Sequence, residues 1–132
     1  MDNMKSFRIF FLLPVLLLAL GCQGQTGSQK LAVDSFENKL TGTSDKIILD
    51  VRTADEYKKG HLANATLIDY YGSNFKDQIN QLDKSKPVFV YCASGGRSAS
   101  AAKILGQLGF KEVYDLQGGF NAWSNAKKPV ER

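Results

Sequence analysis

Residues 88–98 are VFVYCASGGRS, and this stretch decides the fold of the chain. Its first four residues are apolar, branched or aromatic, as expected for a strand buried on both faces. A glycine pair follows, and residues 98–108 are rich in alanine and leucine, which predicts a helix. A buried strand that turns directly into a helix is the repeating unit of parallel sheets.

Strand and helix signals alternate on both sides of this stretch. Predicted strands cover residues 30–33, 46–51, 66–68, 88–91 and 113–116. Two predicted helices begin at capping pairs, Asp34 with Glu37 and Thr53 with Glu56. The remaining helical signals are the face Phe75, Ile79 and Leu82, residues 98–108, and the segment around Trp123 after Gly118-Gly119. We therefore predict an α/β fold with a five-stranded parallel sheet flanked by helices on both faces.

The first residues have the layout of a secretory signal. Lys5 and Arg8 precede an apolar run, residues 9–20, and a small residue follows it. The run is shorter than the roughly 20 residues that span a bilayer. We expect residues 1–21 to be a signal peptide; a buried core helix and an uncleaved anchor are the alternatives.

Residues 18–22 resemble the lipobox of bacterial lipoproteins, in which the cysteine is lipidated and becomes the first residue after cleavage. Ala19 stands where that family most often has leucine, and an ordinary signal with an incidental Cys22 is the alternative. The polar, flexible residues 22–29 suit a tether. We expect a periplasmic lipoprotein of the bacterial cell envelope, anchored by its lipid, with a domain at 30–126 and a loose tail at 127–132.

Charge and cysteine content narrow the function. The formal net charge is +4 without a dense cluster of lysine and arginine, so nucleic acid is not an expected partner. Cys22 and Cys92 are the two cysteines. They could pair in a disulfide, but lipidation of Cys22 would leave Cys92 a lone, reactive thiol. We expect a monomer without metal or cofactor.

The position of Cys92 suits a nucleophile. It follows the strongest strand and precedes a helix, where parallel sheets place their ligands. Helix N-terminal amides lower the pKa of a nearby thiol. Gly95 and Gly96 allow an anion-binding nest, and Arg97 suits an oxyanion. The candidate anion-binding loop comprises Ala93, Ser94, Gly95, Gly96, Arg97 and Ser98.

Other uses of this cysteine find less support. No second cysteine lies two or three residues away, which argues against dithiol exchange. The only histidine, His61, cannot be placed beside Cys92 from spacing alone. The alternative to a nucleophile is an inert cysteine that is buried at the end of a strand and has no catalytic role.

Four motifs follow one another along the chain: residues 50–57 (DVRTADEY), 60–65 (GHLANA), 91–98 (YCASGGRS) and 116–123 (LQGGFNAW). Together they resemble the rhodanese-like single-domain sulfurtransferases over about residues 31–124. Asn64 stands where that family frequently has glycine, and asparagine tolerates the left-handed backbone better than most residues.

This resemblance implies a transfer in two steps. Cys92 would take the outer sulfur of a small anionic donor, thiosulfate or a persulfide, and pass it to a thiophilic acceptor. By the same likeness Asp50 and Arg52 are structural residues near the loop, and His61 holds a turn through hydrogen bonds.

Two rival functions stay open beside this thiosulfate sulfurtransferase-like activity. One is a non-catalytic sensing or binding module of the same fold. The other is a phosphatase or arsenate reductase-type enzyme. The related cell-cycle phosphatases have five residues between cysteine and arginine, whereas four separate Cys92 from Arg97. Ala93 stands where the family often has a charged or bulky residue, which leaves the choice of sulfur donor open.

Overall fold

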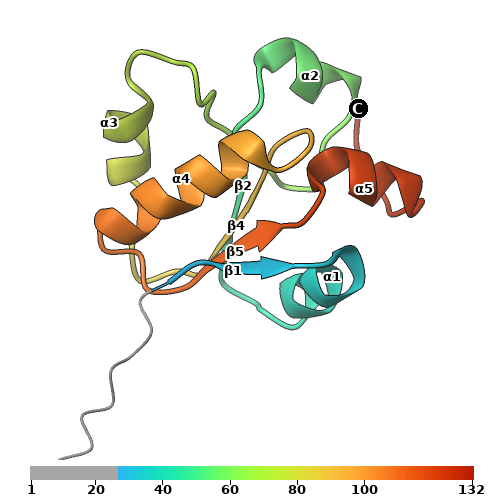
Figure 1. Ribbon diagram of the computed structural model, residues 1–132, viewed down its shortest axis with the longest axis horizontal. Coiled ribbons are helices and arrows are strands. Elements are labelled where there is room, and N and C mark those ends of the chain that lie inside the picture. Colours follow the sequence, from blue (N-terminus) through green and yellow to red (C-terminus); the bar gives the residue numbers. More distant parts are fainter. Residues whose placement is uncertain (1–26) are drawn as a thin grey trace, which may run out of the picture.

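Five parallel strands form the centre of the fold, in the order β1-β5-β4-β2-β3 (Figure 1). The computed structural model describes residues 27–132. The predicted signal peptide at 1–21, Cys22 and the tether residues up to 26 lie outside these described residues. The strands are β1 (Gln29–Leu31), β2 (Ile47–Asp50), β3 (Thr66–Leu67), β4 (Val88–Tyr91) and β5 (Val113–Leu116).

Helices cover both faces of this sheet, which confirms the predicted architecture (Figure 1). Helices α3 and α4 pack on one face, and α1 and α5 pack on the other. The helices are α1 (Val33–Thr41), α2 (Ala54–Lys59), α3 (Phe75–Asn80), α4 (Gly96–Gln107) and α5 (Gly119–Asn125).

The central strand β4 positions the candidate site. All four of its residues are buried, because β2 and β5 flank it and helices cover it on both sides. Its side chains alternate between the two cores: Val88 and Val90 face α4, while Phe89 and Tyr91 face α1 and α5. Cys92 therefore leaves the sheet at its middle, at the carboxyl end where parallel sheets present their ligands.

The helix predicted after Thr53 is confirmed with its cap. The Thr53 hydroxyl accepts a hydrogen bond from the Glu56 amide, and the Glu56 carboxylate accepts one from the Thr53 amide, so the capping box is complete. Gly60 ends α2 with a φ of 152°.

The first strand and helix differ from the prediction in their starts. Strand β1 begins at Gln29, one residue before the predicted strand, and ends at Leu31, short of residue 33. Ala32 and not Asp34 is the residue before α1, and it has no side chain that could cap the helix. Asp34 lies inside the first turn, where its carboxylate forms an ion pair with Lys128 at 2.9 Å. The negative charge of Asp34 also interacts favourably with the positive end of the helix dipole.

The tail at 127–132, predicted to be loose, is attached to the domain. Glu131 and His61 exchange two backbone hydrogen bonds of 2.8 and 2.9 Å. The Trp123 indole donates to the Pro129 carbonyl at 2.8 Å. The bridge between His61 and Glu131 joins residues far apart in the sequence, so local composition did not reveal it.

Within residues 27–132, no helix is long and apolar enough to cross a membrane.

Candidate active site

Cys92 begins a tight loop that ends in α4. Gly95 adopts a φ of 115°, a left-handed conformation that favours glycine, and it immediately precedes the helix. This geometry turns the Gly95 amide back toward the cysteine, to which it donates a hydrogen bond of 3.1 Å at Sγ. The Cys92 side chain is almost fully buried, with 1% of its surface exposed, and the thiol is free.

The surroundings of Cys92 favour its thiolate. Burial alone raises the pKa of the thiol, but hydrogen bonds from the Ser98 hydroxyl and from the amides of Ser98, Gly95 and Ser94 outweigh it, so the pKa is lowered. As a thiol, Cys92 donates to Ser98 Oγ at 3.4 Å. Once the sulfur is ionised, the same hydroxyl can turn and donate to it.

Helix α5 holds the loop from the other side. The Phe120 amide donates to the Cys92 carbonyl at 2.7 Å, and the Asn121 amide donates to the Ala93 carbonyl at 3.0 Å. This close approach needs glycine at 119, because a Cβ there would lie 2.5 Å from the Cys92 carbonyl oxygen. With these carbonyls hydrogen-bonded to α5, the amides of the loop can point toward the sulfur. The residues of the motif at 116–123 therefore hold the cysteine loop in its conformation.

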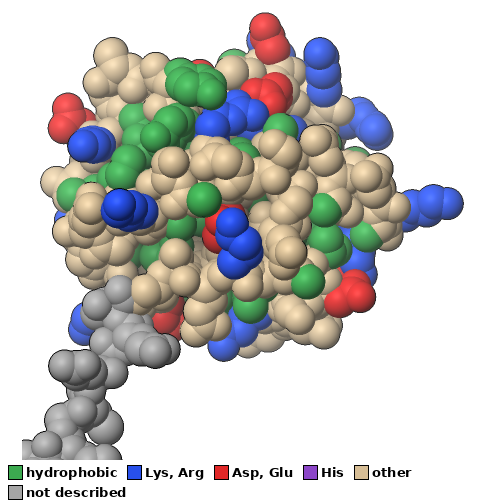
Figure 2. Space-filling model, in the orientation of Figure 1, with side chains coloured by type: hydrophobic (Ala, Val, Ile, Leu, Met, Phe, Trp, Pro, Cys, Tyr) green, Lys and Arg blue, Asp and Glu red, His purple; other side chains and the backbone are tan. Residues whose placement is uncertain are grey.

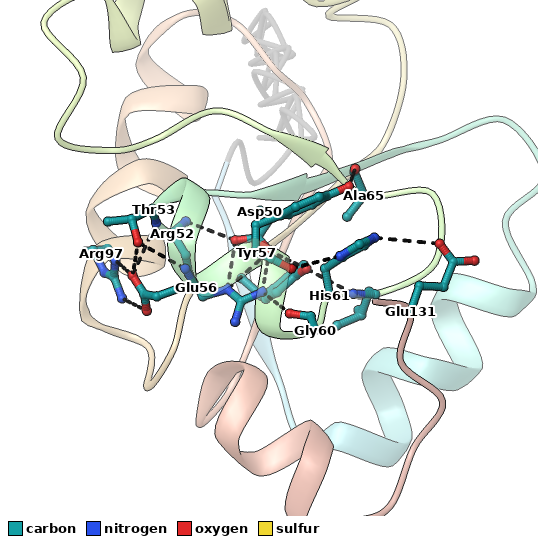
Figure 3. Close-up of polar contacts among 12 residues, drawn as sticks. Asp50, Arg52, Thr53, Glu56, Tyr57, Gly60, His61, Ala65, Arg97 and Glu131 are labelled. Carbon is teal, nitrogen blue, oxygen red and sulfur yellow. Dashed lines mark hydrogen bonds and ion pairs between the residues drawn. The ribbon is translucent and has the colours of Figure 1, made fainter.

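Arg97 closes the loop, and its guanidinium is bound by Glu56 (Figure 3). Nη1 and Nη2 donate to the two carboxylate oxygens at 2.7 and 2.9 Å, a bidentate contact. The Arg97 hydrogen bond is the largest cause that lowers the pKa of Glu56 to about 2. The pKa of Arg97 is raised, chiefly by its hydrogen bond to Glu56. The sequence predicts Arg97 as an oxyanion ligand, and the contact with Glu56 leaves three of its five guanidinium N–H groups for that role.

A pocket of about 400 Å³ opens above the cysteine. Tyr71 stands at the pocket as the one large apolar side chain that is strongly exposed within residues 27–132, and its ring lies 5.7 Å from the Arg97 guanidinium carbon. The residues that line the pocket are Tyr70, Tyr71, Cys92, Ser94, Gly96, Arg97 and Ser100.

A second pocket, of about 470 Å³, shares Tyr70 with the first and continues past Phe75 and Ile104. Figure 2 shows hydrophobic side chains gathered on this face between α3 and α4. In the part of the chain that the structure describes, no group of three His, Cys, Asp or Glu side chains could hold a metal ion.

Asp50 and Arg52 form a buried ion pair behind the loop (Figure 3). Arg52 Nη2 lies 2.7 Å from Asp50 Oδ2 and also donates to the Gly60 carbonyl at 2.7 Å. The Tyr91 hydroxyl donates to Asp50 at 2.6 Å and accepts the Leu62 amide at 3.1 Å. This network ties β2, β4 and the turn after α2 together, and neither charged residue lines the cysteine pocket.

His61 belongs to the same turn and also lies outside the pocket lining. Its ring stacks on Tyr57 with centroids 3.7 Å apart, and Nδ1 contacts the Tyr57 carbonyl at 3.0 Å. Nε2 lies 3.7 Å from the Glu131 carboxylate (Figure 3). Asn64 follows with a φ of 62°, the left-handed conformation that glycine would otherwise supply.

Sequence reasoning missed two residues near the cysteine. Glu56 is recognisable in the sequence as a capping residue, but its contact with Arg97 joins positions 41 residues apart. Asp115 is a buried carboxyl group on β5, opposite Val90 in the parallel register. A charged residue inside an otherwise apolar strand is the signal that marks it.

Comparison with known proteins identifies the family of the domain. The model of the rhodanese-like domain matches residues 32–126. The thiosulfate sulfurtransferase GlpE of Coxiella burnetii is 42% identical over 85 residues, 64% of this chain and 78% of that protein.

Solved structures agree as well. A rhodanese-related protein from Thermoplasma volcanium is 29% identical with a TM-score of 0.69, over 78% of this chain and 97% of that chain. A protein of unknown function from Rhodopseudomonas palustris, described as a possible tyrosine phosphatase, is 31% identical with a TM-score of 0.64, over 78% of this chain and 84% of that chain. The family match over residues 32–126 and these likenesses place the chain in the rhodanese-like family.

Proposed function

We propose that the protein is a sulfurtransferase that carries sulfane sulfur as a persulfide on Cys92. The thiolate attacks the outer sulfur of the donor, and the S–S or S–sulfonate bond of the donor breaks. The leaving group, a thiolate or sulfite, departs with the electron pair. A thiophilic acceptor then attacks the outer sulfur of the persulfide and releases the Cys92 thiolate.

The hydrogen bond from the Gly95 amide to Cys92 Sγ, 3.1 Å long, carries this proposal. It belongs to a cradle that lowers the pKa of the thiol despite near-complete burial. The same backbone donors suit the negative charge of a persulfide, which lies one sulfur atom further into the pocket. The sulfurtransferase GlpE, similar over most of its length, supports the same activity.

The charge of the pocket affects which sulfur donor loads Cys92 most readily. Arg97 is the one cationic side chain among the residues that line it, and Glu56 offsets that charge. Ala93 adds no charge to the loop. A dianion such as thiosulfate therefore meets less positive potential than a free arginine would provide. We expect an alkyl persulfide with one or no negative charge to load Cys92 at lower concentration than thiosulfate does.

Intact-protein mass spectrometry of the full chain tests the transfer. After incubation with thiosulfate or glutathione persulfide, the mass should increase by one sulfur atom, and cyanide should remove it. Cys92→Ser should gain nothing, while Lys111→Gln, an exposed residue outside the pocket, should load as the unaltered protein does. A chain that takes no sulfur from any donor in the panel contradicts the proposal.

The phosphatase alternative has a structural likeness in its favour, the possible tyrosine phosphatase from Rhodopseudomonas palustris. Two features of this site argue against it. Four residues separate Cys92 from Arg97, and the Glu56 carboxylate bound to Arg97 offsets the positive charge that would attract a phosphate dianion. Hydrolysis of an aryl phosphate that depends on Cys92 would favour it. A non-catalytic sensing role would instead leave Cys92→Ser cells as fit as the wild type under cyanide stress.

For localisation we propose an exported lipoprotein anchored at Cys22. The support is the sequence pattern of a basic start, an apolar run, a lipobox-like ending and a polar tether. Bacteria that express the full chain should incorporate a labelled fatty acid into it, and Cys22→Ser should abolish the label. Equal labelling of both chains would contradict lipidation.

A further inference from the structure

The cysteine pocket and the second pocket follow one another along α4. Gly96, Ser100 and Ile104 recur every four residues and therefore share one face of this helix. Gly96 and Ser100 line the cysteine pocket of about 400 Å³, whereas Ile104 lines the second pocket of about 470 Å³. Eight residues of helix span about 12 Å. This face of α4 thus extends well beyond the sulfur of Cys92.

The segment at 70–77 forms the opposite wall. Tyr70 lines both pockets, so the two adjoin at this side chain. The Tyr70 ring meets those of Tyr71 and Phe75 edge to face, with centroids 5.6 and 5.1 Å apart. Together with Ile104 these rings give the second pocket an apolar wall (Figure 2). Such a wall suits the organic part of a ligand whose reactive end lies at the cysteine.

Lys76 and Asp77 bring two opposite charges to the second pocket. Both side chains are exposed and line it. Neither forms an ion pair within residues 27–132. A cation and an anion side by side complement a ligand that carries both a carboxylate and an ammonium group. Amino acids and short peptides have this combination of charges.

The length of the site limits the size of that ligand. Thiosulfate has no group that could extend from Cys92 into the second pocket. A single amino acid spans about 3.5 Å of extended chain, whereas two or three residues span about 7–10 Å. The distance along α4 from Gly96 to Ile104 is about 12 Å. A peptide of two or three residues therefore fits the site better than one amino acid does.

We propose that the second pocket binds the body of a short peptide persulfide and that Lys76 and Asp77 select it. This inference rests on the proposed function and names its substrate class. The outer sulfur of the donor lies at Cys92, and the peptide extends along α4. The Cys92 thiolate attacks that sulfur, the S–S bond of the donor breaks, and the peptide leaves as a thiolate with the electron pair. One negative charge thereby moves from Cys92 to the peptide sulfur.

The concentration dependence of sulfur loading tests the selection. The full chain is incubated with thiosulfate, cysteine persulfide or glutathione persulfide, and the rate of mass gain is measured. Lys76→Gln and Asp77→Asn should each raise the half-saturating concentration of glutathione persulfide by about two- to fivefold, as expected for loss of one exposed ion pair. The maximal rate and the values for thiosulfate should stay the same. Lys103→Gln, an exposed residue of α4 that lines neither pocket, is the matched control.

A second measurement needs no sulfur transfer. S-Methylglutathione is a thioether without a transferable sulfur, and its binding to the full chain is followed by NMR. We expect shifts at Phe75 and Ile104, and a dissociation constant that rises by about two- to fivefold in Lys76→Gln. Lys103→Gln should bind it as the unaltered protein does.

Several results would overturn the proposal. One is a half-saturating concentration of glutathione persulfide that neither variant changes, and another is an equal rise for thiosulfate. A third is S-methylglutathione that shifts no residue of the second pocket. Variants that slow loading from a persulfidated protein, but not from glutathione persulfide, would assign the pocket to a protein donor instead. If no donor loads Cys92, the proposed function fails, and binding of S-methylglutathione still decides whether the second pocket holds a peptide.

Discussion

The ion pair between Glu56 and Arg97 gives the most quantitative prediction. Its bidentate contact holds the pKa of Glu56 at about 2 instead of 4.5. If the whole change reflected the pair, it would correspond to about 3 kcal/mol. The side chains are 32% and 17% exposed, so solvent screens part of the attraction. We expect a coupling energy of about 1–2 kcal/mol.

A double-mutant cycle measures this coupling. Glu56→Gln, Arg97→Met and the double variant are unfolded in urea at pH 7, and the non-additive part of their free energies of unfolding is the coupling. The exposed pair of Lys86 and Asp45, 3.1 Å apart, is the matched control, for which we expect about 0–0.5 kcal/mol. A coupling for Glu56 and Arg97 no larger than that of the control would refute the reasoning.

The pair also predicts the effect of acid. Because the pKa of Glu56 is lowered in the folded chain, its stabilisation is complete above pH 4.5 and is lost as the pH falls toward 2. In that range the free energy of unfolding should fall less steeply for Glu56→Gln than for the unaltered protein. Equal slopes would show that Glu56 does not contribute to acid unfolding.

The remaining predictions concern the loop and the buried network behind it. Gly119→Ala should destabilise by about 1–3 kcal/mol, since φ is +60° and the new Cβ meets the Cys92 carbonyl; an unchanged thermal midpoint would contradict this. Tyr91→Phe should cost about 1–3 kcal/mol in urea unfolding, because Asp50 loses a buried hydrogen bond of 2.6 Å. Arg52→Met should cost about 3–5 kcal/mol by the same assay, because it leaves that carboxylate without its cation, and a loss below that of Tyr91→Phe would argue against a tight pair.

Much of the fold follows from local patterns. The strands at 88–91 and 113–116 have the bounds that the sequence predicts, because Pro87 precedes the first, Gly118 follows closely on the second, and all their residues except Asp115 are branched or aromatic. The capping box at Thr53 follows from two residue types three positions apart. Such features depend on neighbours in the chain and are visible in the sequence.

The contacts that complete the site do not follow in this way. Arg97 meets Glu56 only because β4 lies beside β2, and Asp115 lies opposite Val90 only because β5 inserts between β1 and β4. The attachment of Glu131 to His61 depends on the same topology. In each case the order of the strands in the sheet, and not the spacing of the residues in the sequence, brings the two residues together.

The hold of α5 on the cysteine loop has a consequence for synthesis. The amides of Phe120 and Asn121 that bind the Cys92 and Ala93 carbonyls leave the ribosome after the cysteine loop itself. A nascent chain that has emerged only as far as α4 therefore lacks these two hydrogen bonds. A chain cut before Gly119 would keep Cys92 and lose the contacts by which α5 holds the cysteine loop.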